Sequence, residues 1–190
     1  MNIDRLRAET PGCDHHVHLN NAGAGLMPDP VLKAIRDHLD LEARLGGYEA
    51  AEQRGAAMTA AYEAVGALTG VAARQIAFTE NATASFVQAL SSIPFERGDV
   101  LLTTRNDYVS NQIQLLSLKQ RLGVRVLRIP DLPEGGVDPD AARSLIASER
   151  PRLVCVTHVP TNSGLIQDVR AVGKACREYD VTYLVDACQS

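Results

Sequence analysis

Short apolar runs alternate with longer segments of mixed polarity through most of the chain. The runs have the composition of buried strands, and the segments between them carry apolar residues at helical spacing. The five predicted strands are Gln75–Thr79, Asp99–Thr104, Arg125–Ile129, Leu153–Thr157 and Tyr183–Asp186, and the helices between them are Ala82–Ser92, Ser110–Leu122, Pro139–Ser148 and Ile166–Tyr179. This alternation predicts an α/β fold, in which a mostly parallel sheet is sandwiched by helices.

Two longer helices are predicted before the alternating part. The first covers Val31–Leu45 and is followed by glycines. The second covers Ala50–Thr69, whose alanine-rich sequence favours a helix. No proline- or glycine-rich linker long enough to separate domains interrupts the chain. We therefore expect one domain, residues 31–190, preceded by an N-terminal arm of residues 1–30.

Composition narrows the class of protein. The chain of 190 residues is 45% hydrophobic, enough for a core, and its net charge is -4 with a pI near 5.7. Lysine and arginine do not cluster on any predicted face, so we expect no nucleic-acid partner. No stretch approaches the roughly 20 apolar residues that cross a bilayer, and the first residues do not resemble a signal peptide. We expect a globular, cytoplasmic protein without a membrane partner.

Cysteine and histidine residues leave two interpretations open. The cysteines lie in apolar segments without CxxC spacing, which favours free buried thiols over disulfides; they are Cys13, Cys155, Cys176 and Cys188. His15, His16 and His18 follow Cys13 and Asp14 closely, as metal ligands can. No second ligand cluster follows, so a structural role or a place in a first strand is favoured and no metal is expected.

Polar residues follow the predicted strands at their carboxyl ends, where ligands bind in open α/β sheets. Thr79–Ser85 turns from a strand into a helix, and the free N–H groups and positive dipole of a helix start favour a phosphate there. The alternative is an ordinary helix cap by Asn81 or Thr83. Tyr108 follows the next strand, where it could cover a flat ligand or pack as an ordinary loop residue.

The last two strands also end in polar groups. Thr157–Gly164 supplies an imidazole, hydroxyls and an amide, although His158 alone is more typical of a structural histidine. Asp186 and Gln189 add a carboxylate and an amide at the end of the chain. Together the strand ends indicate one ligand site. Neither a GxGxxG nor a Walker sequence occurs, so a generic Rossmann-like nucleotide binder is a minor alternative.

These segments together resemble the class V aminotransferase family of fold type I pyridoxal-phosphate (PLP) enzymes, which includes cysteine desulfurases and isopenicillin-N-epimerase-like proteins. The resemblance covers nearly the whole chain and is carried by Leu19–Pro28, Phe78–Thr83, His158–Gly164 and Val185–Gln189. It implies the PLP-binding large domain of that fold, incomplete at its C-terminal end, over residues 31–190. It also implies an amino-acid substrate and a homodimer.

The resemblance further implies roles for individual residues. Asn81, Ala82 and Thr83 would hold the cofactor phosphate, the last two through backbone N–H groups and Thr83 also through its hydroxyl. Tyr108 would stack on the ring, at a position where desulfurases carry a histidine, a departure that argues against desulfurase chemistry. Asp186 would pair with the pyridine nitrogen and keep it protonated, so that the ring accepts electrons.

Other site residues are implied more loosely. Thr161 or Asn162 would lie near the phenolic oxygen of the cofactor, and Gln189 would form a hydrogen bond with that oxygen. In the loop within the N-terminal arm, the residues that would approach the substrate are Asn20, Asn21 and Gly23.

The lysine that forms the Schiff base in this family has no counterpart in the chain. Lys33, Lys119 and Lys174 lie on predicted helices and precede Asp186, whereas the family's lysine follows that aspartate. We therefore expect the N-terminal part of a longer enzyme, without the C-terminal small domain and inactive alone. A complete chain that needs a partner polypeptide is the alternative.

The expected function follows from the family. The chain would be the PLP-binding portion of an enzyme that acts on amino acids by transamination, desulfuration or β-elimination, or epimerisation. The alternative is a non-catalytic module, a fragment or pseudoenzyme that binds PLP noncovalently or serves in dimerisation.

Overall fold

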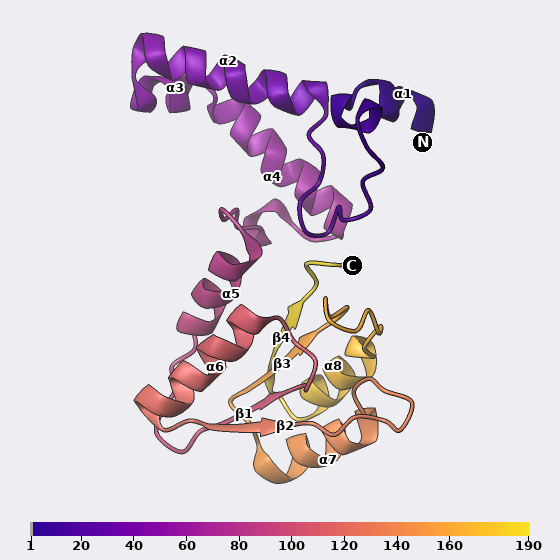
Figure 1. Cartoon of the computed structure of the whole chain (residues 1–190). Helices are drawn as coiled ribbons and strands as arrows, with labels where there is room; N and C mark the ends of the chain where they lie inside the picture. Colours follow the sequence, from indigo (N-terminus) through magenta and orange to yellow (C-terminus); the bar gives the residue numbers. More distant parts are fainter. Residues whose placement is uncertain (1) are drawn as a thin grey trace. The chain divides into compact units, whose positions relative to one another are not determined.

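The computed structural model describes residues 2–190, and the chain divides into two compact units. One unit ends at Phe78 and the other spans Thr79–Ser190. Figure 1 labels the helices and strands of both units. The predicted boundary between an arm of residues 1–30 and a domain of residues 31–190 stays a prediction.

The first unit is helical. Its α-helices are α1 (Ile3–Ala8), α2 (Asp29–Leu45), α3 (Gly47–Gln53) and α4 (Gly55–Thr69), and its 3-10 turns are η1 (Pro11–Asp14) and η2 (Ala73–Gln75). The helix predicted over Val31–Leu45 is confirmed as α2, which begins two residues earlier because a proline fits the first turn of a helix.

The helix predicted over Ala50–Thr69 is interrupted and was therefore wrong as one element. Arg54, with φ -94° and ψ 2°, leaves the helical conformation between α3 and α4. Gly55 follows directly, and glycine has a low helix propensity because its backbone loses the most entropy on ordering. The alanine-rich text thus makes two helices rather than one.

The strand predicted over Gln75–Thr79 does not form. Gln75 ends the turn η2, where its side-chain Oε1 accepts a hydrogen bond from the backbone N–H of Ala72 at 3.2 Å. Local side-chain bonds of this kind compete with a strand ladder. Phe78 packs instead on Tyr62 of α4, with ring centroids 4.5 Å apart. The sheet accordingly has four strands within the described residues, not the predicted five.

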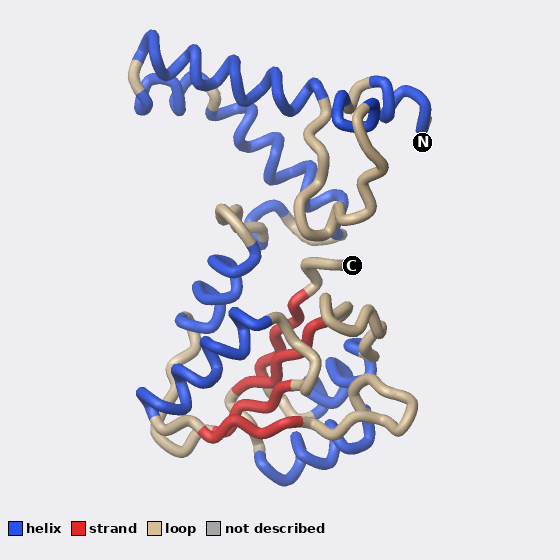
Figure 2. Tube along the Cα trace, viewed as in Figure 1, coloured by secondary structure: helices blue, strands red, loops and turns tan. Residues whose placement is uncertain are grey.

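The second unit contains the sheet. Its strands are β1 (Val100–Thr103), β2 (Arg125–Arg128), β3 (Leu153–Thr157) and β4 (Thr182–Asp186), all parallel and in the order β2-β1-β3-β4. Figure 2 shows them side by side in red. The other four predicted strands are thereby confirmed, with boundaries that differ by at most one residue. Thr157 pairs with Asp186, so β3 and β4 end level with each other.

Helices cover both faces of this sheet, as predicted (Figure 1). Helices α5 (Ala82–Ser91) and α6 (Val109–Leu122) pack on one face, and α7 (Pro139–Glu149) and α8 (Val169–Glu178) pack on the other. Alternate strand residues point to opposite faces. Leu101 and Leu115 therefore share a core with α5, whereas Leu102 and Ile146 lie in the core beneath α7 and α8.

Candidate functional site at the carboxyl ends of the strands

The strand order has a switch point between β1 and β3, and open α/β sheets form a crevice outside the carboxyl ends of the strands at such a point. β2 lies on one side of β1, and the next strand in sequence, β3, lies on the other side. The connections after β1 and β3 thus leave in opposite directions, and ligands bind outside the carboxyl ends of the strands at such a point. The β1–α6 loop and the ends of β3 and β4 meet here.

Asp186 ends β4 at this crevice and is held by two donors. Its Oδ2 accepts a hydrogen bond from Nδ2 of Asn111 at 2.7 Å, and its Oδ1 accepts one from the backbone N–H of Cys188 at 3.0 Å. The carboxylate is half-buried, whereas Asn111 is only 2% exposed. A carboxylate offers about four acceptor directions, so Asp186 can still receive a ligand N–H.

Asp107, in the β1–α6 loop, is a second carboxylate of the crevice. Its Oδ1 accepts hydrogen bonds from the backbone N–H of Tyr108 at 2.7 Å, from Nδ2 of Asn111 at 3.1 Å and from the hydroxyl of Thr157. Its Oδ2 accepts one from Nε2 of Gln112 at 2.9 Å. The loop is therefore tied to the ends of β3 and β4.

Sequence reasoning did not assign roles to Asp107 and Asn111. Asp107 lies just before the N-cap of α6 and Asn111 lies in the first turn of the helix, and at this separation of four residues the two side chains meet. That spacing is a detectable signal, but it is also common in ordinary helix starts. Only the burial of Asn111 and its contact with Asp186 distinguish the pair.

The start of α5 lies close to the end of β4. A hollow of about 250 Å³ separates them, lined by Ala82, Ser85, Phe86 and Ala89 from the helix and by residues 184–188. The N–H groups of Ala82 and Thr83 belong to the first helical turn, which has no intrahelical acceptors for them. The hollow therefore brings the start of α5, at Ala82, and Asp186 to one place.

Asn81 and Thr83 have structural partners at this helix start. Asn81 is the N-cap of α5, and its Oδ1 accepts a hydrogen bond from the backbone N–H of Ala84 at 2.9 Å. Its side chain thus makes the cap that the sequence offered as an alternative. The hydroxyl of Thr83 lies 3.2 Å from the hydroxyl of Ser110, which links α5 to the start of α6. A part for Asn81 in phosphate binding stays a prediction.

Residues from the loops after β1, β3 and β4 also meet. Nε2 of Gln189 donates to Oγ1 of Thr161 at 2.6 Å, and Nδ2 of Asn162 donates to Oδ1 of Asn106 at 3.5 Å. Tyr108 is 46% exposed and is the N-cap residue of α6. The side chains of Tyr108, Thr161 and Gln189 are thereby accessible to a ligand at this edge.

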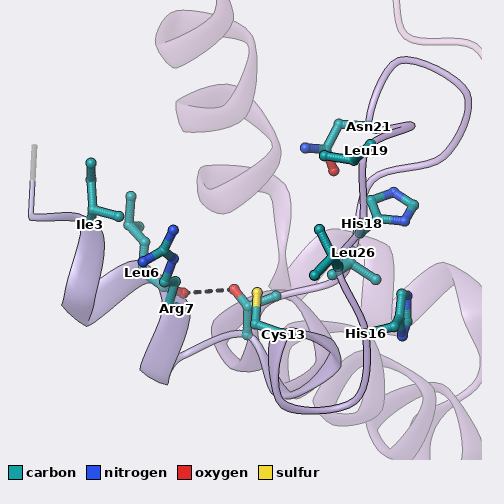
Figure 3. A pocket seen from close by; sticks show the side chains of 11 residues that line it. Ile3, Leu6, Arg7, Cys13, His16, His18, Leu19, Asn21 and Leu26 are labelled. Atoms are coloured by element: carbon teal, nitrogen blue, oxygen red, sulfur yellow. Dashed lines mark hydrogen bonds between the residues drawn. The ribbon is translucent and has the colours of Figure 1, made fainter.

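The three predicted substrate-side residues belong to the first unit. Oδ1 of Asn20 accepts a hydrogen bond from the backbone N–H of Gly23 at 3.2 Å, and a Cβ at Gly23 would lie 2.7 Å from Nδ2 of Asn20. A side chain at position 23 would therefore displace the Asn20 amide. Asn21 lines a pocket with side chains of α1 such as Leu6, as Figure 3 shows. Their contact with a substrate stays a prediction.

The histidines near the N-terminus form no strand. His16 and His18 stack edge-on with centroids 5.9 Å apart, and Nε2 of His18 lies 2.9 Å from the carbonyl oxygen of Ala24. The predicted first strand is thus wrong, because this histidine is engaged with its own loop. Among residues 2–190 no group of three possible ligands is arranged to hold a metal ion.

The four cysteines divide into two classes. Cys155 and Cys176 are buried, and burial raises the pKa of the Cys155 thiol to about 12 and that of Cys176 to about 11. Cys13 and Cys188 are exposed, contrary to the expectation that all four are buried. Cys13 lies within the exposed 3-10 turn η1, and Cys188 lies in the loop after Asp186, so both thiols are in contact with solvent.

The helices of residues 2–190 include none that is both long and apolar enough to span a bilayer.

Comparison with known families adds to this geometry. The family model for aminotransferase class V matches residues 17–190, which is most of the chain. The chain belongs to the aminotransferase class-V family.

Two curated relatives are similar in sequence to this class V chain over nearly its whole length. A probable cysteine desulfurase of Methanothermobacter thermautotrophicus is 29% identical over 100% of the chain and 48% of its own length. A probable hercynylcysteine sulfoxide lyase of Mycobacterium tuberculosis is 32% identical over 98% of the chain and 46% of its own length. The chain thus spans about half the length of the curated relatives that it matches.

Solved structures agree with the fold. An apo cysteine desulfurase from Thermococcus onnurineus superposes with a TM-score of 0.83 at 26% identity, over 97% of the chain and 47% of that protein. A mutant of C-DES that carries glycine covalently linked to its PLP cofactor has a TM-score of 0.84 at 21% identity, over 97% of the chain and 50% of that protein. The chain therefore has the α/β fold of these PLP-dependent proteins, as predicted.

Proposed function

We propose that this chain is the PLP-binding portion of a class V aminotransferase-like enzyme that acts on amino acids. The observation that carries the proposal is the hollow between α5 and β4, where Ala82 at the start of the helix and Asp186 at the end of the strand lie together. Membership of the family and the PLP cofactor of a structural neighbour support it and disfavour a generic nucleotide binder. Transamination, desulfuration or β-elimination, and epimerisation are the candidate reactions.

The donor set fits PLP at both ends of the cofactor. The N–H groups of Ala82 and Thr83 suit a phosphate, because a helix start carries partial positive charge. Asp186 suits a protonated ring nitrogen, because its carboxylate is held in place and retains acceptor capacity. When bound, PLP supplies an electron sink for a bond that breaks at the substrate α-carbon.

Other residues of the chain would orient the ring. Tyr108 would cover one face of the ring, and its exposure leaves the phenol free to do so. Gln189 and Thr161 are already linked to each other, and together they would bind the phenolic oxygen. Asp186 would hold the proton on the ring nitrogen throughout the reaction.

A non-catalytic PLP-binding or dimerisation module is the second candidate. It is favoured by the positions of the lysines: Lys33 contacts Asp37 on α2, and Lys119 and Lys174 are exposed on α6 and α8. The lining of the hollow at Asp186 contains none of these described lysines. We also propose the homodimer that the resemblance implies and the cytoplasmic location that the sequence led us to expect.

Titration of the chain with pyridoxamine 5′-phosphate tests the proposal. This probe lacks an aldehyde, so it cannot react with surface lysines and reports the noncovalent site alone. We expect saturable binding by calorimetry, and about 10-fold weaker binding by Asp186→Asn because a hydrogen bond to a charged group is lost. Asp140→Asn, an exposed acid on α7, is the matched control and should bind normally.

Absence of saturable binding, or equal binding by Asp186→Asn, would contradict the proposed function. Borohydride reduction in the presence of PLP separates the two candidates. Specific fixation of the cofactor to one lysine of this chain would show that a Schiff-base residue is in reach, and would exclude the noncovalent module.

A further inference from the structure

One buried amide joins the two carboxylates of the crevice. Nδ2 of Asn111 donates to Oδ1 of Asp107 at 3.1 Å and to Oδ2 of Asp186 at 2.7 Å. An amide nitrogen carries two hydrogens, so both are used. Asn111 thereby connects the loop after β1 with the end of β4, 75 residues further along the chain.

Chemistry alone determines which way this amide points. Ionised carboxylates only accept hydrogen bonds, so the NH2 group must face Asp107 and Asp186. The opposite orientation would place Oδ1 of Asn111 against two negative groups. Because Asn111 is 2% exposed, water cannot readily replace either bond. The side chain thus has a single favourable orientation.

Asp107 in turn is held by groups other than Asn111. It accepts hydrogen bonds from the hydroxyl of Thr157 and from Nε2 of Gln112. Oε1 of Gln112 accepts a hydrogen bond from the guanidinium of Arg128 at 2.8 Å, and Arg128 also donates to the carbonyl of Thr104 at 3.2 Å. One network therefore joins the ends of all four strands.

The same carboxylate also holds the backbone of Tyr108. The Tyr108 N–H donates to Oδ1 of Asp107 at 2.7 Å, the atom that receives the Asn111 amide. Both proposed ring contacts, Asp186 at the nitrogen and Tyr108 at the face, thus depend on Asp107. Neither Asp107 nor Asn111 has an assigned role in the proposed site.

We propose that Asn111 and Asp107 are positioning residues of the cofactor site: Asp107 orients Asn111 and Tyr108, and Asn111 orients the Asp186 carboxylate toward a cationic ring nitrogen. The inference rests on the proposed function. Neither residue touches the reacting atoms, and each acts through Asp186 or Tyr108. A hydrogen bond in a network is best apportioned by a double-mutant cycle, since single deletions mix local and transmitted effects.

The test combines binding with a spectroscopic signal in the chain of 190 residues. Pyridoxamine 5′-phosphate labelled with ¹⁵N in the ring reports, through its nitrogen resonance, whether the ring is protonated. For Asn111→Leu we expect about 10-fold weaker binding and a resonance shifted toward the unprotonated form. In the Asp186→Asn background, Asn111→Leu should cause little further loss, because its target is already removed.

Two further variants guard against a folding defect. Asn111→Asp keeps the size of the side chain but replaces the NH2 donor with a carboxylate that faces Asp107 and Asp186. It should therefore weaken binding at least as much as Asn111→Leu. Gln120→Leu replaces an exposed amide on the same helix and should behave as the wild type. Circular dichroism and thermal unfolding of each variant show whether the fold is retained.

The outcomes separate this inference from the proposed function. If the wild type does not bind the probe, or Asp186→Asn binds equally well, the proposed function fails and this inference with it. If Asp186→Asn weakens binding but folded Asn111→Asp or Asn111→Leu does not, only the positioning role is overturned. An equal loss from Asn111→Leu in both backgrounds likewise overturns it, since the effect would not pass through Asp186.

Discussion

Asp99 lies just before β1, at the amino ends of the strands, and the candidate site lies at their carboxyl ends. Its carboxylate accepts a hydrogen bond from the backbone N–H of Glu96 at 2.8 Å and pairs with the guanidinium of Arg152 at 3.2 Å. The Glu96 N–H, and secondarily Arg152, lower the pKa of Asp99 below its ordinary value, against the opposing effect of burial. The contribution of this carboxylate to the stability of the fold therefore depends on pH.

A lowered pKa in the folded state gives stability that is present above the unfolded pKa of about 3.9 and is lost as the pH falls through the folded value. We expect the free energy of unfolding of the wild type to decline below about pH 4, and to decline less steeply in Asp99→Asn. Urea denaturation at a series of acidic pH values measures this slope. Glu134→Gln, an exposed acid after β2, should retain the wild-type slope; an identical slope in Asp99→Asn would contradict the assignment.

Single residues of the site differ in how visible they are in the sequence. Asp186 and Gln189 stand at the end of an apolar run, so their placement follows from the run and the family motif. Asn111 lies inside a helix of mixed polarity, where an amide is usually solvent-exposed. Its burial depends on the contact between the first turn of α6 and the end of β4. This contact is long-range, so the local sequence does not predict it.

The start of α5 is the element on which the phosphate proposal depends. Asn81 takes an extended backbone conformation, and its side chain binds the N–H of Ala84. The cap keeps Ala82 and Thr83 at the open first turn, so their N–H groups remain directed out of the helix. The cap and the proposed anion site thus share one geometry.

Replacement of this cap should cost stability and ligand affinity together. We expect Asn81→Ala to lower the free energy of unfolding by about 1 kcal/mol, as N-cap truncations typically do. Asn81→Asp keeps an acceptor for the Ala84 N–H and should retain most of this stability. Urea denaturation measures the difference. No loss in Asn81→Ala, or the same loss in Asn81→Asp, would show that the side chain does not cap α5.

The helices and strands were predicted well where the local sequence pattern agrees with the burial of the residues. Four strands and the helices between them appear near their expected positions, because apolar periodicity reflects burial on the two faces of the sheet. Gln75–Thr79 has a similar apolar sequence pattern but no neighbouring strand. The side chain of Gln75 satisfies a local backbone group instead, which a count of apolar residues does not reveal.

At the scale of the whole molecule, the unit Thr79–Ser190 carries both sheet faces and the candidate site. Its two cores are built from its own strands and helices, with Leu102, Ile146 and Val172 fully buried on one face and Leu101 and Leu115 on the other. A unit with its own core can fold independently. The described residues of the other unit, 2–78, include helices and contribute no strand to this sheet.

We therefore expect residues 79–190, expressed alone, to unfold cooperatively in urea and to show the circular dichroism of an α/β protein. Leu102→Ala in this fragment should lower the free energy of unfolding by about 2–5 kcal/mol, because the side chain is fully buried. A gradual, non-cooperative transition, or insensitivity to Leu102→Ala, would mean that the core of this unit does not form without residues 2–78.

The sequence by itself determined the α/β class, the parallel sheet between two helical layers and the class V resemblance, which the family comparison confirmed. Periodicity and strand-end motifs are local properties, so they can be read without knowing which strands are neighbours. The tertiary structure alone decided the order β2-β1-β3-β4, the exclusion of Gln75–Thr79 from the sheet and the Asp107–Asn111–Asp186 link. These depend on contacts between segments far apart in the chain, and no local pattern specifies which distant partner a residue meets.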